Sequence, residues 1–279
     1  MASQLPHLEP ITRLSPRVVR ILGGNPGKFT LQGTNTYLIG TGPKRILLDT
    51  GEGNKIWPET LATALKQEGA EIDTVLLSHW HPDHVGGVKD LRAISPHARI
   101  LKHHPTPEQQ DIDDGQVFHT DGATLRAVHC PGHTTDHMAF VLAEEHALFT
   151  GDNVLGHGTA VFEDLAVYLS SLDAMRRQFT GRAYPGHGDV VADGPAKIDE
   201  YLSHRRQREE EILAVLREEE GEGGATSRGI VRVVYSGYPE GLWGPAEGGV
   251  VQVLKKLEGE GRVVRGEGER WRVQGRSAL

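Results

Sequence analysis

Residues 79–84 place four potential metal ligands within six positions. The segment follows the apolar run at residues 75–77 and consists of His79-Trp80-His81-Pro82-Asp83-His84. The apolar run predicts a buried strand, and the Pro and Gly residues after it predict a loop and then a helix over residues 85–94. Burying imidazoles and a carboxylate without partners costs about a few kcal/mol per group. A metal ion removes that cost, so this spacing indicates a metal site.

Three later loops each add one further ligand. Each loop contains glycine and follows a strand-like run, and the three are Cys130-Pro131-Gly132-His133, Thr150-Gly151-Asp152-Asn153 and Pro185-Gly186-His187-Gly188. Glycine lets the backbone approach a bound ion closely. One such loop alone is weak evidence, but the ordered series after the first segment predicts a site with two metal ions.

The ligand types suggest how the two ions are shared. We expect one site from His79, His81 and His133, a second from Asp83, His84 and His187, and a bridge from Asp152. Imidazole and carboxylate ligands without thiolate favour zinc, with manganese as the fallback. Two ions about 3.5–4 Å apart can generate a shared hydroxide at neutral pH. We expect Asp83 to be the catalytic residue because it can hold the proton of that water.

The other ligand-type residues have more ordinary interpretations. We expect Cys130 to pack as a small buried residue and Asp49 to orient ligands from the end of its strand. His137 is expected either to support the ligands or to face the substrate, and His157 is left open. Eight further histidines are expected at the surface or in the core: His7, His97, His103, His104, His119, His129, His146 and His204.

The composition bounds the class of protein. The chain of 279 residues is long enough for one large and one small domain. It carries no apolar run that could span a bilayer and no signal-peptide pattern at its N-terminus, and it has one cysteine, so we expect a cytoplasmic protein without membrane partners. Residues 222–279 hold nine Lys/Arg and seven Glu, which gives a net charge of +2. Because the whole chain has a net charge of −8, residues 1–221 carry −10. That acidic part disfavours extended contact with a polyphosphate.

Periodicity predicts the elements that hold the ligands. Strand-like runs cover residues 17–22, 35–39, 45–49, 75–77, 99–101, 124–128, 138–142 and 147–149. Helical patterns cover residues 58–69, 85–94, 164–179 and 196–220. Several strands are apolar on both faces, so we expect an α/β fold in which helices cover the sheets.

The pattern changes after the charged, glycine-rich linker at residues 218–224. Two amphipathic helices, at 226–235 and 247–258, precede a short hairpin at 262–264 and 271–273. This order predicts a small winged-helix-like domain at residues 221–279 and a catalytic domain at residues 1–220. Three residues of the small domain are candidates to line a substrate channel, namely Tyr238, Leu242 and Trp243. The alternative is that they pack inside the small domain.

The ordered ligand set resembles that of the metallo-β-lactamase superfamily, over residues 17–190. The resemblance implies a four-layer αββα sandwich with a binuclear metal site at one sheet edge. His84 is unlike true metallo-β-lactamases and resembles the hydrolases of the glyoxalase II and ribonuclease Z kind. The chain is thus expected to be a metal-dependent hydrolase.

Longer segments resemble the β-lactamase-like protein 2 subfamily, as does the winged-helix-like tail. They are residues 25–42, 132–137, 161–165 and 201–205. One branch of that group, in fungi, comprises thioesterases that release aromatic polyketides from the acyl carrier protein of a non-reducing polyketide synthase. The other, in animals, is a mitochondrial single-strand endoribonuclease. Residues 49–53 with Trp57 favour the fungal branch, so we expect a polyketide thioester substrate and a carrier-protein partner. The alternative is the ribonuclease, with nucleic acid as its substrate.

Overall fold

The computed structural model describes residues 5–219 and 223–274. The chain forms two compact units, one of residues 1–163 with 167–199 and one of residues 164–166 with 200–279. Helix α5 (Gly194–Glu218) contributes residues to both units. Part of the predicted linker, residues 220–222, lies outside the described residues, and the domain boundary at residue 220 stays a prediction.

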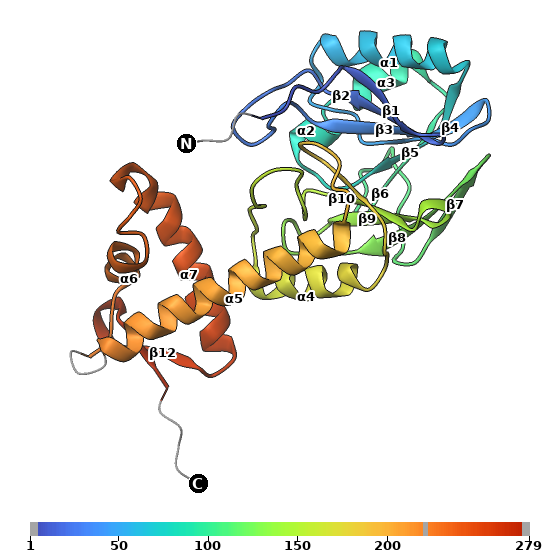
Figure 1. Ribbon diagram of the computed structural model, residues 1–279. Coiled ribbons are helices and arrows are strands. Elements are labelled where there is room, and N and C mark those ends of the chain that lie inside the picture. The colour runs from blue at the N-terminus through green and yellow to red at the C-terminus, as the bar shows by residue number, and fades with distance from the viewer. Residues whose placement is uncertain (1–4, 220–222, 275–279) are drawn as a thin grey trace. The chain divides into compact units, whose positions relative to one another are not determined.

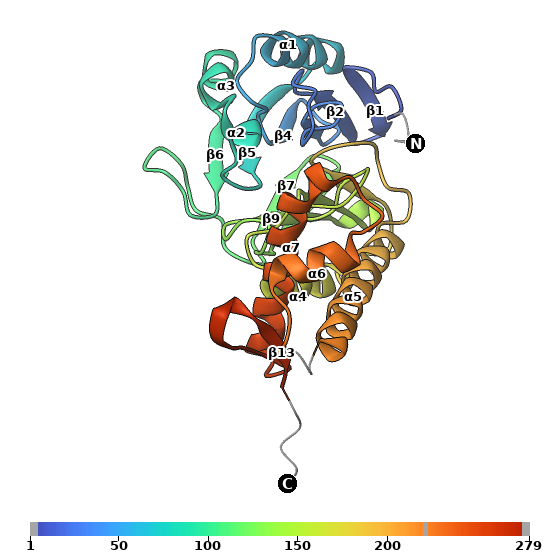
Figure 2. The ribbon, with the colours of Figure 1, turned by 90° about the vertical axis from the view of Figure 1, so that its left-hand side faces the viewer.

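Two sheets form the centre of the first unit. The first has the spatial order β1 (Ile11–Ser15), β2 (Val18–Leu22), β3 (Asn35–Ile39), β4 (Lys44–Leu48), β5 (Glu71–Leu77) and β6 (Arg99–Lys102). The second has the order β11 (Ala183–Pro185), β10 (Ala147–Gly151), β9 (Met138–Leu142), β8 (Ala123–His129) and β7 (Val117–Thr120). Helices α1 (Ile56–Glu68) and α3 (Val88–Ile94) cover the outer face of the first sheet, and α4 (Leu165–Arg176) covers that of the second (Figures 1 and 2). The predicted four-layer αββα sandwich is confirmed.

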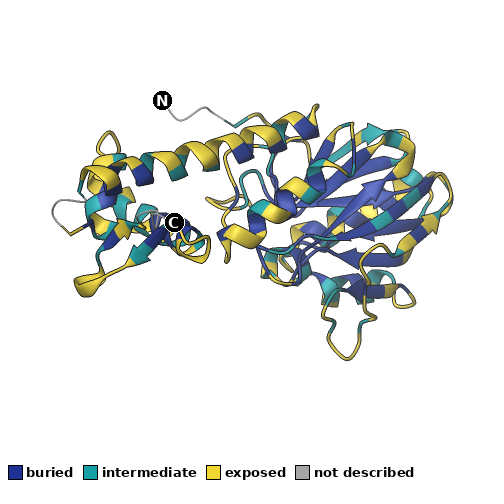
Figure 3. Ribbon diagram, turned by 90° about the horizontal axis from the view of Figure 1, so that it is seen from below, coloured by how far each residue is buried: buried dark blue, intermediate teal, exposed yellow. Residues whose placement is uncertain are grey.

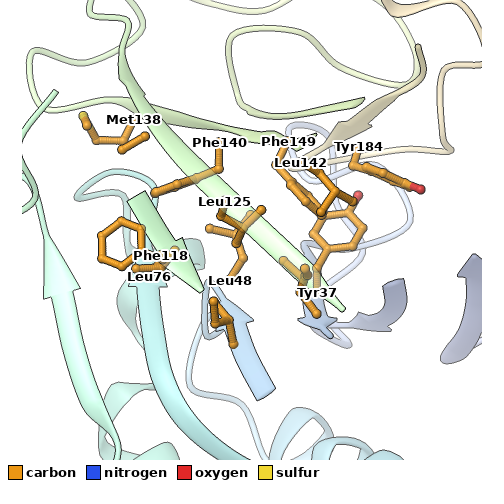
Figure 4. Close-up of a cluster of buried hydrophobic side chains, with 14 of the residues drawn as sticks. Tyr37, Leu48, Leu76, Phe118, Leu125, Met138, Phe140, Leu142, Phe149 and Tyr184 are labelled. Carbon is orange, nitrogen blue, oxygen red and sulfur yellow. The ribbon is translucent and has the colours of Figure 1, made fainter. Parts of the chain in front are cut away.

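The inner strands β2 and β3 of the first sheet are buried at every position. On β3, Tyr37 and Ile39 join the core between the two sheets, while Leu38 joins the core under helix α1. Figure 4 shows the inter-sheet core, in which the Tyr37 ring lies 5.0 Å from that of Phe149 on the second sheet. Each fully buried side chain of this size contributes about 1.5–3 kcal/mol. The two-sided burial explains why the sequence of these strands is apolar without alternation.

The predicted helix at residues 85–94 is two helices, α2 (Pro82–Val85) and α3. It breaks at Gly86 and Gly87, where the backbone lies directly on the loop after β4. A Cβ at Gly87 would be 1.9 Å from the carbonyl oxygen of Thr50, and one at Gly86 would be 2.4 Å from that of Glu52. Helix α2 begins at Pro82, inside the ligand segment, and its single turn carries Asp83 and His84.

Three strands lie outside the strand ranges predicted from the sequence. Strands β1 and β7 lie at sheet edges and are only partly buried, so their apolar signal is weak. Strand β11 is three residues long and ends in Pro185, a residue that argues against a strand. The other predicted strands are present, with end points that differ by a few residues.

The second unit contains the predicted helix pair and hairpin. After α5 come α6 (Ser227–Val234), α7 (Trp243–Gly259), β12 (Val263–Arg265) and β13 (Trp271–Val273), with short 3-10 turns at Glu240–Leu242 and Glu267–Glu269. Thr226 caps α6 by accepting the Gly229 amide hydrogen. Buried residues recur along α5, among them Ile212 and Leu216. In Figure 3 the long helix shows buried positions between exposed ones. The winged-helix-like arrangement is confirmed.

Two of the three candidate wall residues are exposed in this unit. Tyr238 and Leu242 are about half exposed, at 52% and 48%, so neither packs in the core of the small unit. Trp243 is half-buried, and its Nε1 donates to the carbonyl oxygen of Tyr238 at 3.3 Å. Their contact with a substrate stays a prediction. Every helix in residues 5–219 and 223–274 is too short or too polar to cross a lipid bilayer.

Candidate metal centre

The seven predicted ligands lie at one edge of the sheets. His79 to His84 follow β5, while His133, Asp152 and His187 follow β8, β10 and β11. Strands β10 and β11 are parallel, and β8 and β10 are both antiparallel to β9, so these three strands end at the same edge. Strand direction therefore gathers loops that are far apart in the sequence.

The first group is the predicted histidine triad with Asp152. His79 Nε2 and His133 Nε2 each lie 3.0 Å from His81 Nδ1. Asp152 Oδ2 lies 3.6 Å from His133 Nε2 and 4.0 Å from His79 Nε2. One ligand atom from each of the four residues lies within 4.8 Å of the others, so the group can surround a single ion.

The second group contains Asp83, His84 and His187, again with Asp152. His187 Nε2 lies 3.1 Å from Asp83 Oδ2 and 3.3 Å from Asp152 Oδ2. His84 Nε2 lies 3.3 Å from Asp152 Oδ1. Because Asp152 belongs to both groups, its carboxylate can bridge two ions, as the sequence predicts.

Asp49 orients the second group from the end of β4. Its Oδ1 accepts the Ser78 amide hydrogen at 2.8 Å, and its Oδ2 accepts from Ser78 Oγ at 2.9 Å. The same Oδ2 lies 2.8 Å from His84 Nδ1. A carboxylate only accepts, so His84 Nδ1 carries a hydrogen and its Nε2 faces the ligand group. Asp49 has the position of the ligand-orienting residue that the sequence predicts.

The same logic applies to two histidines of the first group. His133 Nδ1 lies 2.8 Å from the carbonyl oxygen of Val161, so it donates and leaves the Nε2 lone pair free. His79 Nδ1 lies 2.9 Å from Ser78 Oγ. Since that hydroxyl hydrogen already points to Asp49, His79 Nδ1 donates to the oxygen. Both rings thus present an unprotonated Nε2 to the centre of the group.

Two buried atoms show that the site fits a cation. Among the described residues, His84 Nε2 and Asp152 Oδ1 are fully buried and make no well-aligned hydrogen bond, although they lie 3.3 Å apart. An unsatisfied buried polar atom costs about 1–3 kcal/mol, more for a charged group. A divalent ion coordinated by these two atoms offsets that cost. The nitrogen and carboxylate ligands suit zinc or manganese.

The charges of the metal-free site are unevenly distributed. Burial and the charge of His84 hold the pKa of His79 well below its usual value. Burial also lowers the pKa values of His84 and His187, but the nearby Asp152 carboxylate outweighs this effect. The pKa of His84 is raised well above its usual value, and that of His187 is raised to about 9. The pKa of Asp152 is held well below its usual value, against the effect of burial, by His187 and His84. Metal binding must therefore displace protons from the second group.

Cys130 and His137 are fully buried beside the ligand groups. Burial raises the pKa of the Cys130 thiol to about 12, which makes it an unreactive packing residue, as predicted. His137 is fully buried, its Nδ1 lies 3.2 Å from Cys130 Sγ, and its Nε2 accepts the Asp152 amide hydrogen at 3.1 Å. Of the two roles considered for His137, the structure agrees with support of the ligands and not with contact to substrate.

A cavity of about 290 Å³ opens above the ligands. Its floor contains five of them: His81, Asp83, His133, Asp152 and His187. Its walls are mainly apolar and come from the β2–β3 loop, which carries Phe29 and Leu31, and from the loop before α4, which carries Leu155 and Val161. His157 lines the cavity, whereas none of the eight histidines set aside belongs to either ligand group. The wall residues were not identified from the sequence, because single apolar residues in loops carry no pattern.

Comparison with known proteins identifies the family. Residues 29–187 match the description "Metallo-beta-lactamase superfamily". The chain belongs to the metallo-beta-lactamase superfamily. Residues 226–271 match the "Beta-lactamase associated winged helix domain". The resemblance stated from the ligand set and from the tail is thereby confirmed for both units.

Two relatives in this superfamily are similar over nearly the whole chain. The "Atrochrysone carboxyl ACP thioesterase" of Aspergillus chevalieri is 47% identical over 283 residues, which cover 98% of this chain and 92% of the relative. A protein of the same name from Emericella nidulans is 46% identical and covers 96% of this chain and 87% of its own length. A solved structure of a beta-lactamase domain protein from Burkholderia ambifaria superposes with a TM-score of 0.79 at 20% identity, over 98% of this chain and 96% of that one. This last likeness concerns the fold.

Proposed function

We propose that the protein is a metal-dependent thioesterase that hydrolyses the thioester between an aromatic polyketide and an acyl carrier protein. The observation that carries the proposal is the pair of ligand groups sharing Asp152 at the floor of an apolar-walled cavity. The two relatives named as thioesterases suggest the substrate class. The partner is then an acyl carrier protein, and we propose that it belongs to a non-reducing polyketide synthase.

The proposed cofactor is a pair of zinc ions, with manganese as the fallback. His79, His81 and His133 would hold one ion, Asp83, His84 and His187 the other, and Asp152 both. Bound there, divalent cations supply the Lewis acidity that polarises a thioester carbonyl and acidifies water. Hydrogen bonds at Nδ1 fix the ring orientations of His79, His84 and His133. The rings therefore need little reorganisation when a cation binds.

Asp83 is the proposed proton acceptor. Its side chain is 22% exposed, lines the cavity, and is the more open of the two site carboxylates, since that of Asp152 is 12% exposed. Burial opposes its ionisation, but the hydrogen bond from His187 and the charge of His84 lower the pKa of its carboxyl. An ionised carboxylate at the floor can take the proton of the attacking water. A thiol is acidic enough, with a pKa of about 8.5 for the cysteine side chain, that the leaving group departs as a thiolate without a nearby acid.

The competing hypothesis is a single-strand endoribonuclease that uses the same ligands to attack phosphorus. A ribonuclease must hold several phosphates, and its affinity falls steeply with salt. The charge of −10 on residues 1–221 opposes such binding. A thioesterase for a weakly charged ring system depends on apolar contact and responds little to salt.

One preparation of the metal-loaded protein can decide between the two activities. We expect rapid hydrolysis of an aromatic acyl-pantetheine thioester, slow or no cleavage of single-stranded RNA, and little change of the thioesterase rate between low and high salt. The Asp83→Ala protein serves as the control for contaminating enzymes. RNA cleavage that depends on Asp83 and falls steeply with salt, without thioester turnover, would contradict the proposal.

A further inference from the structure

The two most exposed large apolar side chains of the described residues both line the cavity. Phe29 is 69% exposed and Val161 is 59% exposed. They come from different loops, the β2–β3 loop and the loop before α4. Single exposed apolar residues are common on protein surfaces. Two at the mouth of one cavity, above a polar floor, indicate a surface that a ligand covers.

The loop that carries Phe29 is held in place by its own hydrogen bonds. Asn25 Oδ1 accepts the Thr34 amide hydrogen at 2.9 Å, and Asn25 Nδ2 donates to Thr34 Oγ1 at 3.0 Å. Thr30 Oγ1 donates to the carbonyl oxygen of Asn25 at 2.6 Å. These bonds close the loop on both sides of Phe29, so its ring is presented to solvent by a fixed backbone and can bind without an ordering cost for the loop.

Val161 is tied directly to the ligand group. Its carbonyl oxygen accepts the hydrogen of His133 Nδ1 at 2.8 Å, so its position is set relative to that ring. The Phe29 loop has a similar link, because Thr34 Oγ1 lies 3.4 Å from Asp83 Oδ2. Both side chains therefore belong to loops that are linked to the ligand groups, and both line the same cavity.

On the basis of the proposed thioesterase activity, we propose that Phe29 and Val161 form an acyl subsite that selects a flat, apolar acyl group. Leu31 and Leu155 also line this cavity. The cavity of about 290 Å³ is at the lower end of the usual size of ligand pockets. We expect a planar ring system to cover both side chains and a two-carbon acyl group to be too short to do so.

The test compares two thioesters, 2-naphthoyl-pantetheine and acetyl-pantetheine, on the same metal-loaded variants. In Phe29→Ala and Val161→Ala we expect the ratio of kcat/KM for naphthoyl over acetyl to fall about tenfold, the usual effect of removing a central apolar contact. Acetyl turnover should stay within about twofold, because that group does not reach the subsite. Phe29→Tyr keeps the ring and should keep the ratio. Ile56→Ala is the matched control, since Ile56 is 56% exposed and does not line the cavity.

A binding measurement separates this inference from the proposed activity. Calorimetry with the ketone analogue of 2-naphthoyl-pantetheine, in which a methylene replaces sulfur, reports the subsite without turnover. We expect about tenfold weaker binding to Phe29→Ala and Val161→Ala and unchanged binding to Ile56→Ala. Failure of the wild-type protein to hydrolyse either thioester would contradict the proposed function alone. Unchanged analogue binding, or equal loss of both thioesterase activities with normal metal content, would overturn the subsite.

Discussion

At the scale of single residues, Asp83 is the more exposed of the two candidate carboxylate ligands that line the cavity. We expect Asp83→Ala to lower kcat/KM for an aromatic thioester by about 10²–10⁴-fold, the usual contribution of a positioned proton acceptor. The reason is the loss of the carboxylate that lies 3.1 Å from His187 Nε2 and faces the cavity. Steady-state kinetics with metal analysis of the same sample measure the effect.

The control for this substitution is His7→Ala. His7 is exposed and belongs to neither ligand group. The kcat/KM of the His7→Ala variant should therefore equal that of the wild-type protein. Circular dichroism should show folded protein for both variants. Near-normal turnover in a folded Asp83→Ala protein would remove Asp83 from the mechanism.

At the scale of elements, one buried ion pair connects the two sheets beneath the site. Lys102 on β6 donates to Asp136 in the loop between β8 and β9, and Asp136 Oδ1 also accepts from Thr134 Oγ1 at 2.7 Å. Both side chains are less than a tenth exposed. We expect Lys102→Met to lower the free energy of unfolding by about 3–5 kcal/mol, because it leaves the Asp136 carboxylate buried and unpaired. Urea denaturation measures the change.

The double variant Lys102→Met/Asp136→Leu tests the cause of this loss. It removes both charges, so we expect it to be more stable than the single variant. Equal stability of the two variants would show that packing of the lysine chain, and not the unpaired charge, causes the loss. Arg177→Met is a matched control, because Arg177 pairs with Asp173 on the surface and such pairs contribute at most about 1 kcal/mol.

At the scale of the whole molecule, metal binding couples stability to pH. The pKa of His187 is raised from 6.5 to about 9 in the metal-free protein, so its protonated form stabilises the fold fully below pH 6.5, and this stabilisation is lost as the pH rises through 9. Bound metal requires the neutral ring. We therefore expect the difference in Tm between metal-loaded and EDTA-treated protein to widen from pH 6.5 to pH 9.

Thermal unfolding of both forms across this pH range measures the effect. At a free metal concentration 100 times Kd, bound metal should stabilise the fold by about 2.7 kcal/mol. Calorimetric titration in two buffers with different ionisation enthalpies counts the protons that metal displaces. Equal Tm values with and without EDTA at every pH would contradict the metal site.

The ligand segment and the sheet strands could be predicted because their signals are local. Residues 79–84 are neighbours in the chain, and the fully buried strands β2 and β3 each contain two or three consecutive apolar residues. The same locality explains the misses. The helix break at Gly87 depends on a carbonyl of Thr50, which contacts it only in the folded chain, and the edge strands β1 and β7 lack the burial that makes a strand visible in a sequence.

The sequence by itself determined the superfamily, the set of candidate ligands and the two-part organisation of the chain, because residue types and their spacing are properties of short segments. Only the tertiary structure decided which of its two expected roles His137 has, since it accepts the Asp152 amide hydrogen, and that Phe29 and Val161 share one cavity. These are relations between distant loops. They depend on strand order and direction in two sheets, which no local pattern in the sequence contains.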